Sequence, residues 1–279
     1  MPPTEVVDAV RDDQDQATGQ QESAPLPRAP WSAVWPEFIR QWGYQDGKFE
    51  PEHLEILGPT GSGKTYLEAT ILQERVAARK SAVVFIATKK VDATIMKLGW
   101  PIVDNWAGVK QHRQVIFWPR TKAIGEKRDA YLEAKIFDLL SRLWAAGVKL
   151  IVVFDEIKKI EELSRRIKAL IAMFWREARS AGITMLAMKQ RGQGVLRDMH
   201  SEAAWIAAFK PKHEEDAKFV GAAMGSWRTW LPVLQSLNRD KREFVLLHSV
   251  TGEAVISWVD IPLKPAAKQP SGVYGKRGQ

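Results

Sequence analysis

Short apolar runs recur along the chain, and each has the length of a β-strand. None of them holds more than one polar residue, as in strands that helices cover on both faces of a parallel sheet. The runs are Leu54–Leu57, Ala82–Ala87, Gln114–Trp118, Leu150–Phe154, Ile183–Met188 and Ala203–Phe209. This pattern predicts a central, mostly parallel sheet.

Amphipathic stretches alternate with these runs and predict helices. The main ones are Trp31–Trp42, Tyr66–Arg79, Glu126–Ala146, Glu161–Ser180 and Lys212–Met224. The aromatic residues of the first stretch recur at spacings of three and four, which is typical of a packing face rather than of a chemical site. Near the end, Glu243–His248 and Ala254–Val259 flank a Thr-Gly turn and predict a β-hairpin. We therefore expect an α/β fold with helices on both faces of the sheet and a C-terminal β-hairpin.

A glycine-rich turn joins the first strand to the helix that follows it. The turn reads Gly58, Pro59, Thr60, Gly61, Ser62, Gly63, Lys64 and Thr65. Strand, glycine-rich turn, Lys-Thr and helix form the context of a phosphate-binding P-loop. Glycines let backbone N–H groups turn inward around phosphate oxygens, and the helix start adds a positive dipole end. The alternative is a chance glycine-rich turn, but the full match favours ATP as the ligand.

Specific roles follow for the last two residues of this turn. Lys64 is predicted to reach the β- and γ-phosphates, and the Thr65 hydroxyl is predicted to ligate Mg²⁺. A second candidate for the metal is Asp155, which ends the apolar run Leu150–Phe154. At the carboxyl edge of the sheet it would lie beside the P-loop and hold the Mg²⁺ water shell. Glu156 would then polarise the attacking water, unless the two acids simply begin a helix.

Composition divides the chain into three parts. Residues 1–30 are rich in Asp, Gln, Pro and Ala, so we expect a disordered acidic tail. Residues 31–262 would form the nucleotide-binding domain, and residues 263–279 a flexible basic tail. The net charge is +8 although the first segment is acidic, and a basic body suggests a polyanionic partner or serves solubility alone.

The same composition bears on the compartment. The chain has no cysteine, so a disulfide framework and thiolate metal sites are excluded. No apolar run approaches the roughly 20 residues that span a bilayer. The N-terminus lacks the basic and apolar segments of a signal peptide. We expect a cytoplasmic protein, in the host cytoplasm if the source is a virus.

Beyond these local patterns, the stretch Arg176–Ile183 followed by Gln190-Arg191 resembles the FtsK/SpoIIIE branch of the FtsK–HerA superfamily of DNA-pumping ATPases. That family has an Ala-Arg-x-x-Gly-Ile pattern before a strand that ends in Thr-Gln-Arg-Pro. Ile86–Lys89 and Gly99–Pro101 are similar to two further family segments. The resemblance covers about residues 53–220 and implies a RecA-like P-loop NTPase fold of the ASCE class.

The resemblance also implies roles for three more residues. Gln190 would be a polar sensor of the γ-phosphate at the strand tip. Arg179 would be an arginine finger that reaches the nucleotide of a neighbouring subunit, although a helix-end cation can also serve the helix dipole. Arg191 is a second candidate for that role or for DNA contact. The chain departs from the family at Ala87 and Thr88, and at Lys189 and Gly192, which suggests a diverged branch.

The function that these features imply is an ATP-driven motor for double-stranded DNA. We expect a homo-oligomeric ring that binds DNA through its backbone, and most specifically a viral or phage genome-packaging ATPase, with a portal or capsid vertex protein as a further partner. The alternative in the same class is a plasmid or mobile-element translocase. Outside that class, an NTP-gated adaptor or a small-molecule kinase would not need Glu156.

Overall fold

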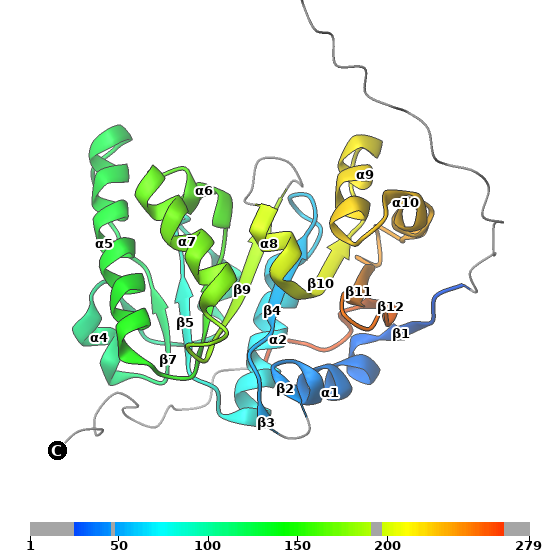
Figure 1. Ribbon diagram of the computed structural model, residues 1–279, viewed down its shortest axis with the longest axis horizontal. Helices are drawn as coiled ribbons and strands as arrows, with labels where there is room; N and C mark the ends of the chain where they lie inside the picture. Colours follow the sequence, from blue (N-terminus) through cyan, green and yellow to red (C-terminus); the bar gives the residue numbers. More distant parts are fainter. Residues whose placement is uncertain (1–24, 46–47, 191–196, 265–279) are drawn as a thin grey trace, which may run out of the picture.

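A ten-stranded sheet forms the centre of the part of the chain that the computed structural model describes, which is residues 25–45, 48–190 and 197–264. Its strands lie in the order β1-β12-β11-β10-β4-β9-β8-β5-β7-β6 (Figure 1). They are β1 (Arg28–Pro30), β4 (His53–Leu57), β5 (Val83–Ile86), β6 (Ile102–Val103), β7 (Gln114–Phe117), β8 (Leu150–Phe154), β9 (Ile183–Lys189), β10 (Ala203–Phe209), β11 (Phe244–His248) and β12 (Ala254–Trp258). A separate small hairpin pairs β2 (Tyr44–Gln45) with β3 (Lys48–Phe49).

The strands from β10 to β6 run parallel, and β11 and β12 add the predicted antiparallel hairpin at one edge. The sheet is therefore mostly parallel, as the apolar runs predict. Strand β9 lies between β4 and β8, so it separates the strand before the glycine-rich turn from the strand before Asp155.

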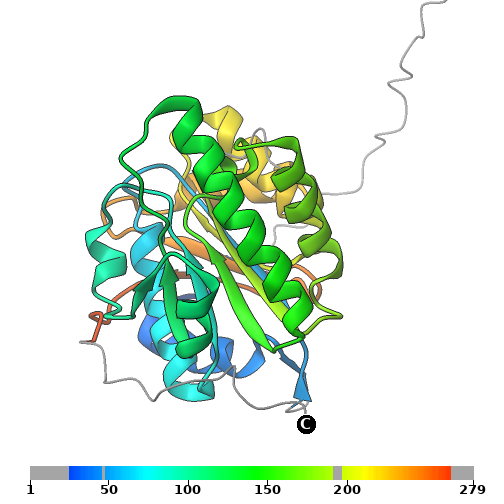
Figure 2. The ribbon, with the colours of Figure 1, turned by 90° about the vertical axis from the view of Figure 1, so that its left-hand side faces the viewer.

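Helices cover both faces of this sheet. Figure 2 shows the sheet between α5 and α7 on one side and α1 and α2 on the other. The helices are α1 (Trp31–Gln41), α2 (Lys64–Arg79), α3 (Ala93–Met96), α4 (Trp106–Gln111), α5 (Gly125–Ala146), α6 (Ile157–Glu161), α7 (Arg165–Glu177), α8 (Arg197–Glu202), α9 (Glu214–Ala223) and α10 (Trp227–Ser236). Among the described residues, no helix combines the length and the apolar character needed to cross a membrane.

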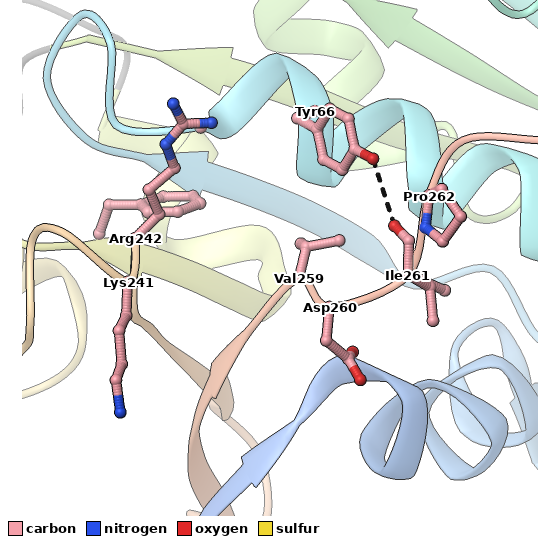
Figure 3. A pocket seen from close by; sticks show the side chains of 9 residues that line it. Tyr66, Lys241, Arg242, Val259, Asp260, Ile261 and Pro262 are labelled. Atoms are coloured by element: carbon pink, nitrogen blue, oxygen red, sulfur yellow. Dashed lines mark hydrogen bonds between the residues drawn. The ribbon is translucent and has the colours of Figure 1, made fainter.

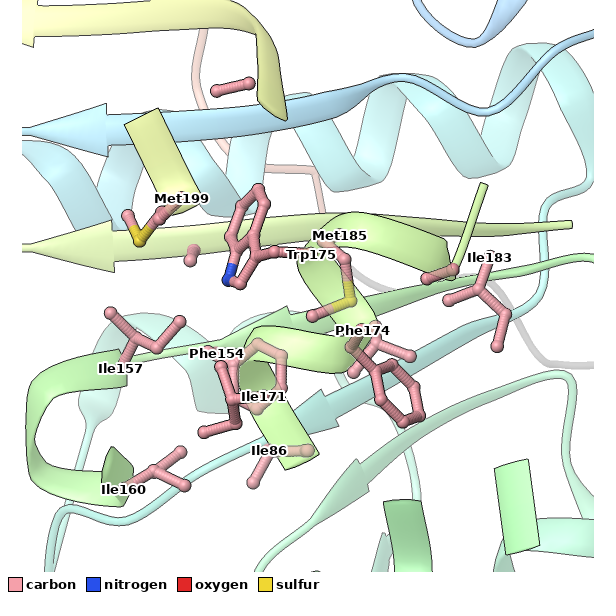
Figure 4. Packing of buried hydrophobic residues seen from close by; sticks show 14 of the residues in the cluster. Ile86, Phe154, Ile157, Ile160, Ile171, Phe174, Trp175, Ile183, Met185 and Met199 are labelled. Carbon is pink, nitrogen blue, oxygen red and sulfur yellow. The ribbon is translucent and has the colours of Figure 1, made fainter. Parts of the chain in front are cut away.

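Alternate residues of each central strand enter different cores, which explains why the runs are apolar throughout. In β8, for example, Val152 and Phe154 face α5 and α7, whereas Ile151 and Val153 face α1 and α2. Figure 4 shows the first core, where Trp175 of α7 packs among side chains from the sheet and from α6 and α8. Burial on both faces rigidly positions the carboxyl ends of the strands, where the glycine-rich turn and Asp155 lie.

Both predicted domain boundaries need correction. The predicted N-terminal tail includes Arg28–Pro30, but this segment pairs with β12, and Arg28 forms an ion pair with Glu243 at 2.6 Å. The predicted C-terminal tail includes Leu263, but the Leu263 N–H donates to the Tyr66 hydroxyl at 3.2 Å. Composition cannot detect these contacts, because each depends on a partner about 200 residues away. Residues 1–24 and 265–279 of the predicted tails lie outside the described residues.

The helix predicted over Glu161–Ser180 is shorter in the structure. α6 ends at Glu161, and α7 spans Arg165–Glu177, because the Ser164 hydroxyl accepts a hydrogen bond from the Ile167 N–H and begins a new helix. Serine is a favoured residue at such an N-cap.

Candidate nucleotide-binding site

The predicted P-loop leaves the carboxyl end of β4 and opens α2, and two of its glycines are required by geometry. A Cβ at Gly58 would lie 2.7 Å from the Cβ of Phe209, which is closer than real Cβ atoms approach one another. Gly63 has φ of +105° immediately before α2, in the left-handed region that glycine adopts most readily. The Gly58 N–H also donates to the Lys189 carbonyl at 3.2 Å, which continues the pairing of β4 with β9 into the turn.

Lys64 lies inside this turn with 8% of its surface exposed. Its Nζ donates hydrogen bonds to the carbonyl oxygens of Gly58 at 2.6 Å and Pro59 at 2.9 Å. Burial lowers the pKa of Lys64 to about 8, and the nearby Lys89 ammonium adds to that effect. The charged form of Lys64 is therefore less favoured than that of an exposed lysine, and an incoming phosphate would stabilise it.

The tip of β9 connects the glycine-rich turn to Glu156. The Thr60 hydroxyl donates to Gln190 Oε1 at 2.9 Å, and Gln190 Nε2 donates to Glu156 Oε1 at 3.0 Å. The other oxygen of Glu156 forms an ion pair with Lys159 at 2.6 Å. Because β9 lies between β4 and β8, a polar residue at its end bridges the two candidate halves of the site.

Asp155 is almost fully buried, with 2% of its surface exposed. Its Oδ1 accepts a hydrogen bond from Lys89 Nζ at 2.7 Å, while its Oδ2 is buried with no hydrogen-bond partner among the described residues. Burial raises the pKa of Asp155, and the Lys89 ammonium offsets part of that rise. A free, buried carboxylate oxygen beside a phosphate cradle fits the donor set that Mg²⁺ takes in phosphate sites.

Two charged residues of the site were missed by sequence reasoning. Lys89 follows the apolar run of β5, so its position at a carboxyl strand end was a usable signal. Glu68 lies on α2 one turn after Lys64, is completely buried, and has no hydrogen-bond partner for either carboxylate oxygen within the described ranges. Burial raises the pKa of Glu68 well above its usual range, and Asp155 adds to the rise.

These groups surround a cavity of about 320 Å³. Its lining includes Lys64, Thr65, Asp155, Glu156 and Gln190. The glycine-rich turn, the Lys64 ammonium group and the two carboxylates are therefore arranged as the binding of a nucleoside triphosphate with a magnesium ion requires. The residues present fit both groups, with Thr65 and Asp155 as the side chains that would hold the metal.

Comparisons with known proteins find similarity in fold but none to a protein-family model or a curated sequence. Among solved structures, the genome packaging NTPase B204 of Sulfolobus turreted icosahedral virus 2 aligns over 76% of this chain and 98% of its own, with 13% identity and a TM-score of 0.58. VirB4 of Thermoanaerobacter pseudethanolicus aligns over 75% of this chain and 89% of its own, with 9% identity and a TM-score of 0.59.

A third match is the cytoplasmic domain of the type VII secretion ATPase EccC of Thermomonospora curvata. It aligns over 82% of this chain and 29% of its own, with 15% identity and a TM-score of 0.57. The chain has the fold of the FtsK–HerA ATPases. The RecA-like α/β class expected from the resemblance is thereby confirmed at the level of fold.

Within this FtsK–HerA-like fold, the predicted site residues fall into two places. The glycine-rich turn, Asp155, Glu156 and Gln190 come together at the carboxyl edge of the sheet. Arg179 lies at the opposite edge, where its Nε donates to the Pro51 carbonyl just before β4. It does not contact its own P-loop, so a role toward a neighbouring subunit stays a prediction. Arg191 lies outside the described residues.

Proposed function

We propose that the protein hydrolyses ATP and uses the energy to move double-stranded DNA. The observation that carries the proposal is the bonded series Thr60–Gln190–Glu156, which joins the phosphate cradle to a carboxylate beside the buried Asp155. A P-loop protein that merely binds nucleotide needs no carboxylate there. In this function Glu156 accepts the proton of the attacking water, and Gln190 holds the carboxylate at the correct distance from the turn.

The other residues of the site would stabilise charge. Lys64 would exchange its carbonyl partners for phosphate oxygens, since a phosphate is the stronger acceptor for an ammonium group. A bound Mg²⁺ would neutralise the phosphates, and Thr65 and Asp155 would hold it. Arg179 would complete the site of an adjacent subunit in a homo-oligomeric ring, which agrees with its place far from its own P-loop.

DNA as the cargo is supported by two observations. The similarity to the viral genome packaging NTPase extends over 98% of that protein, so this chain holds a counterpart of almost the whole of it. The net charge of +8 favours binding to a phosphate backbone. The most specific form of the proposal is therefore a viral or phage packaging motor in the host cytoplasm, which docks on a portal or capsid vertex protein. A plasmid or mobile-element translocase would share the same chemistry.

The test is ATP hydrolysis with and without double-stranded DNA. We expect DNA to stimulate hydrolysis, and DNA affinity to fall steeply with salt whatever the base sequence, because phosphate contacts release counterions. Glu156→Gln should retain ATP binding and abolish hydrolysis, with Lys159→Gln as the control for the neighbouring charge. Rapid hydrolysis by Glu156→Gln would refute the assignment of this site.

A second candidate is a motor for a protein cargo, since the fold is equally similar to a secretion ATPase. Hydrolysis that DNA leaves unchanged over a range of salt concentrations would favour that candidate. Nucleotide binding without hydrolysis under any condition would instead favour an NTP-gated adaptor.

A further inference from the structure

The turn between α10 and β11 places an arginine in an unusual conformation. Arg242 has φ of +53°, in the left-handed region that residues other than glycine rarely adopt. Such backbone strain persists only where the surrounding structure fixes it, and it gathers at binding and catalytic sites. The position of the Arg242 side chain therefore needs an explanation.

The turn that holds Arg242 is fastened on both sides. The side-chain oxygen of Asn238 accepts hydrogen bonds from the N–H groups of Asp240 at 2.9 Å and Lys241 at 3.1 Å. Glu243 Oε2 in turn accepts from the Asn238 N–H at 2.7 Å and from the Arg28 guanidinium at 2.6 Å. Arg242 is thus presented by a fixed turn.

Its side chain extends to the P-loop. The Cδ of Arg242 lies 3.3 Å from the position that a Cβ on Gly63 would take. Figure 3 shows the guanidinium beside the start of α2, while the Lys241 side chain leaves the turn in the opposite direction. Within the described residues, the Arg242 guanidinium makes no hydrogen bond and no ion pair, so its donors are available to a ligand.

Arg242 also lies on the border between two cavities. One is the cavity of about 320 Å³ that holds Lys64 and Asp155. The other, of about 360 Å³, is lined by Gly63, Arg242, the charged side chains of Lys241 and Asp260, and a larger set that is mostly apolar: Tyr66, Phe209, Val259, Ile261 and Pro262. The first suits phosphates, and the second, which combines apolar side chains with the polar groups of Lys241 and Asp260, suits a nucleobase and ribose. A molecule that filled both would contact Arg242, which lines each of them.

We propose that Arg242 is a nucleotide-binding residue supplied by the same chain as the P-loop, and that it binds the α-phosphate, with the nucleoside in the cavity beside Tyr66. The proposal rests on the proposed function, because it needs a nucleotide in the P-loop. Arg242 lines both cavities. The α-phosphate is the group that joins the nucleoside to the other phosphates, so it is the phosphate that would lie where the two cavities meet. Guanidinium groups bind phosphate oxygens in bidentate geometry, which compact ammonium groups cannot do.

The same chemistry would let Arg242 bind a phosphate of the DNA backbone. The nucleotide is favoured because the Arg242 side chain lies against Gly63 and lines the cavity that also holds Lys64 and Asp155. An experiment can separate the two, since a nucleoside monophosphate carries the α-phosphate alone.

The decisive variant is Arg242→Asn, because asparagine tolerates the left-handed backbone and removes the cation. Adenosine, AMP, ADP and ATP compete with a fluorescent ATP analogue on the full chain, and thermal unfolding is recorded alongside. We expect the affinities of AMP, ADP and ATP each to fall about tenfold. The adenosine affinity and the DNA affinity should stay unchanged, and the melting temperature should stay level or rise as the strain is relieved. Lys80→Asn is the matched control, because Lys80 also has a left-handed backbone, with φ of +52°, but lies at the far end of α2. This variant should leave all of these values unchanged.

Each other outcome overturns the assignment. Unchanged nucleotide affinities would remove Arg242 from the site, and a loss confined to ATP would place it on the γ-phosphate. A fall in DNA affinity with AMP binding unchanged would assign it to DNA, and a fall in the melting temperature with equal loss for adenosine would make it structural. Failure of the wild-type protein to bind any of the four ligands would refute the proposed function as well.

Discussion

Nucleotide binding should draw a proton onto Lys64. The pKa of this amine is lowered from 10.5 to about 8 by burial and by the nearby Lys89. Triphosphate oxygens beside Nζ would favour the charged form and return the pKa to its ordinary value or above. At pH 8 the free protein therefore holds Lys64 about half protonated, whereas the bound protein holds it fully protonated.

The size of the effect follows from these two protonation states. Binding should take up about 0.1 proton at pH 7, about 0.5 at pH 8 and about 0.9 at pH 9. The sign is fixed because the free site loses its charge as the pH rises through 8, while the bound site keeps it. The observed affinity should accordingly fall about tenfold between pH 7 and pH 9.

Calorimetry measures this uptake directly. Titrations with ATP at pH 8 in two buffers of different ionisation enthalpy should give binding enthalpies that differ by the enthalpy of about half a proton. Lys64→Arg is the matched control, because a guanidinium keeps its charge throughout this range. Equal enthalpies in the two buffers, or affinity that stays constant from pH 7 to pH 9, would refute the argument.

Further predictions concern stability and the subunit interface. Burial lowers the pKa of His53 to about 3, so the stability present above its unfolded pKa near 6.5 should be lost as the pH falls, by about 2 kcal/mol at pH 5. Urea unfolding of the wild type and of His53→Gln, at pH 5 and at a pH well above 6.5, tests this. An equal loss of unfolding free energy in the variant would contradict it. Glu68→Gln should raise the melting temperature at pH 8, because the buried carboxyl then has no charge to acquire; a lower value would mean that the charge has a partner. Arg179→Ala should slow hydrolysis by a factor on the order of 10³ and recover activity when mixed with Glu156→Gln. A mixture that gives merely the sum of the two residual rates would exclude a role between subunits.

The site could be predicted from sequence where chemistry is local. The glycine-rich turn is defined by consecutive residues, and Asp155 and Gln190 each follow a recognisable buried strand. Parallel strands bring their carboxyl ends to one edge, so residues more than 90 positions apart in the sequence could be expected together. In the structure, hydrogen bonds join Thr60, Gln190 and Glu156, while the roles of these residues toward a nucleotide stay predictions.

Other features depend on partners that sequence patterns do not reveal. Arg28–Pro30 is too short and too polar to predict a strand, and it becomes one because β12 offers an unpaired edge. Arg242 could not be singled out, because nothing in its neighbours predicts a left-handed backbone or a side chain over Gly63. Both cases show tertiary contacts overriding local preference.

Side-chain contacts between β4, α8 and β9 hold the end of β9 in place beside the P-loop. Beneath the P-loop, Lys189 is almost fully buried, and its Nζ lies 3.0 Å from His200 Nε2, while His200 Nδ1 lies 2.7 Å from Glu55 Oε2. These two contacts connect β9, α8 and β4, and the β9 residue that takes part, Lys189, immediately precedes Gln190. The end of β9 that carries Gln190 is thereby fixed relative to β4, so Gln190 stays within hydrogen-bond distance of Thr60 and Glu156. Replacing His200 with phenylalanine would remove both polar contacts while keeping a ring against Phe219. If the anchored strand is what keeps Gln190 in register, this variant should bind ATP normally but hydrolyse it more slowly, and normal hydrolysis would show that the strand is held without these contacts.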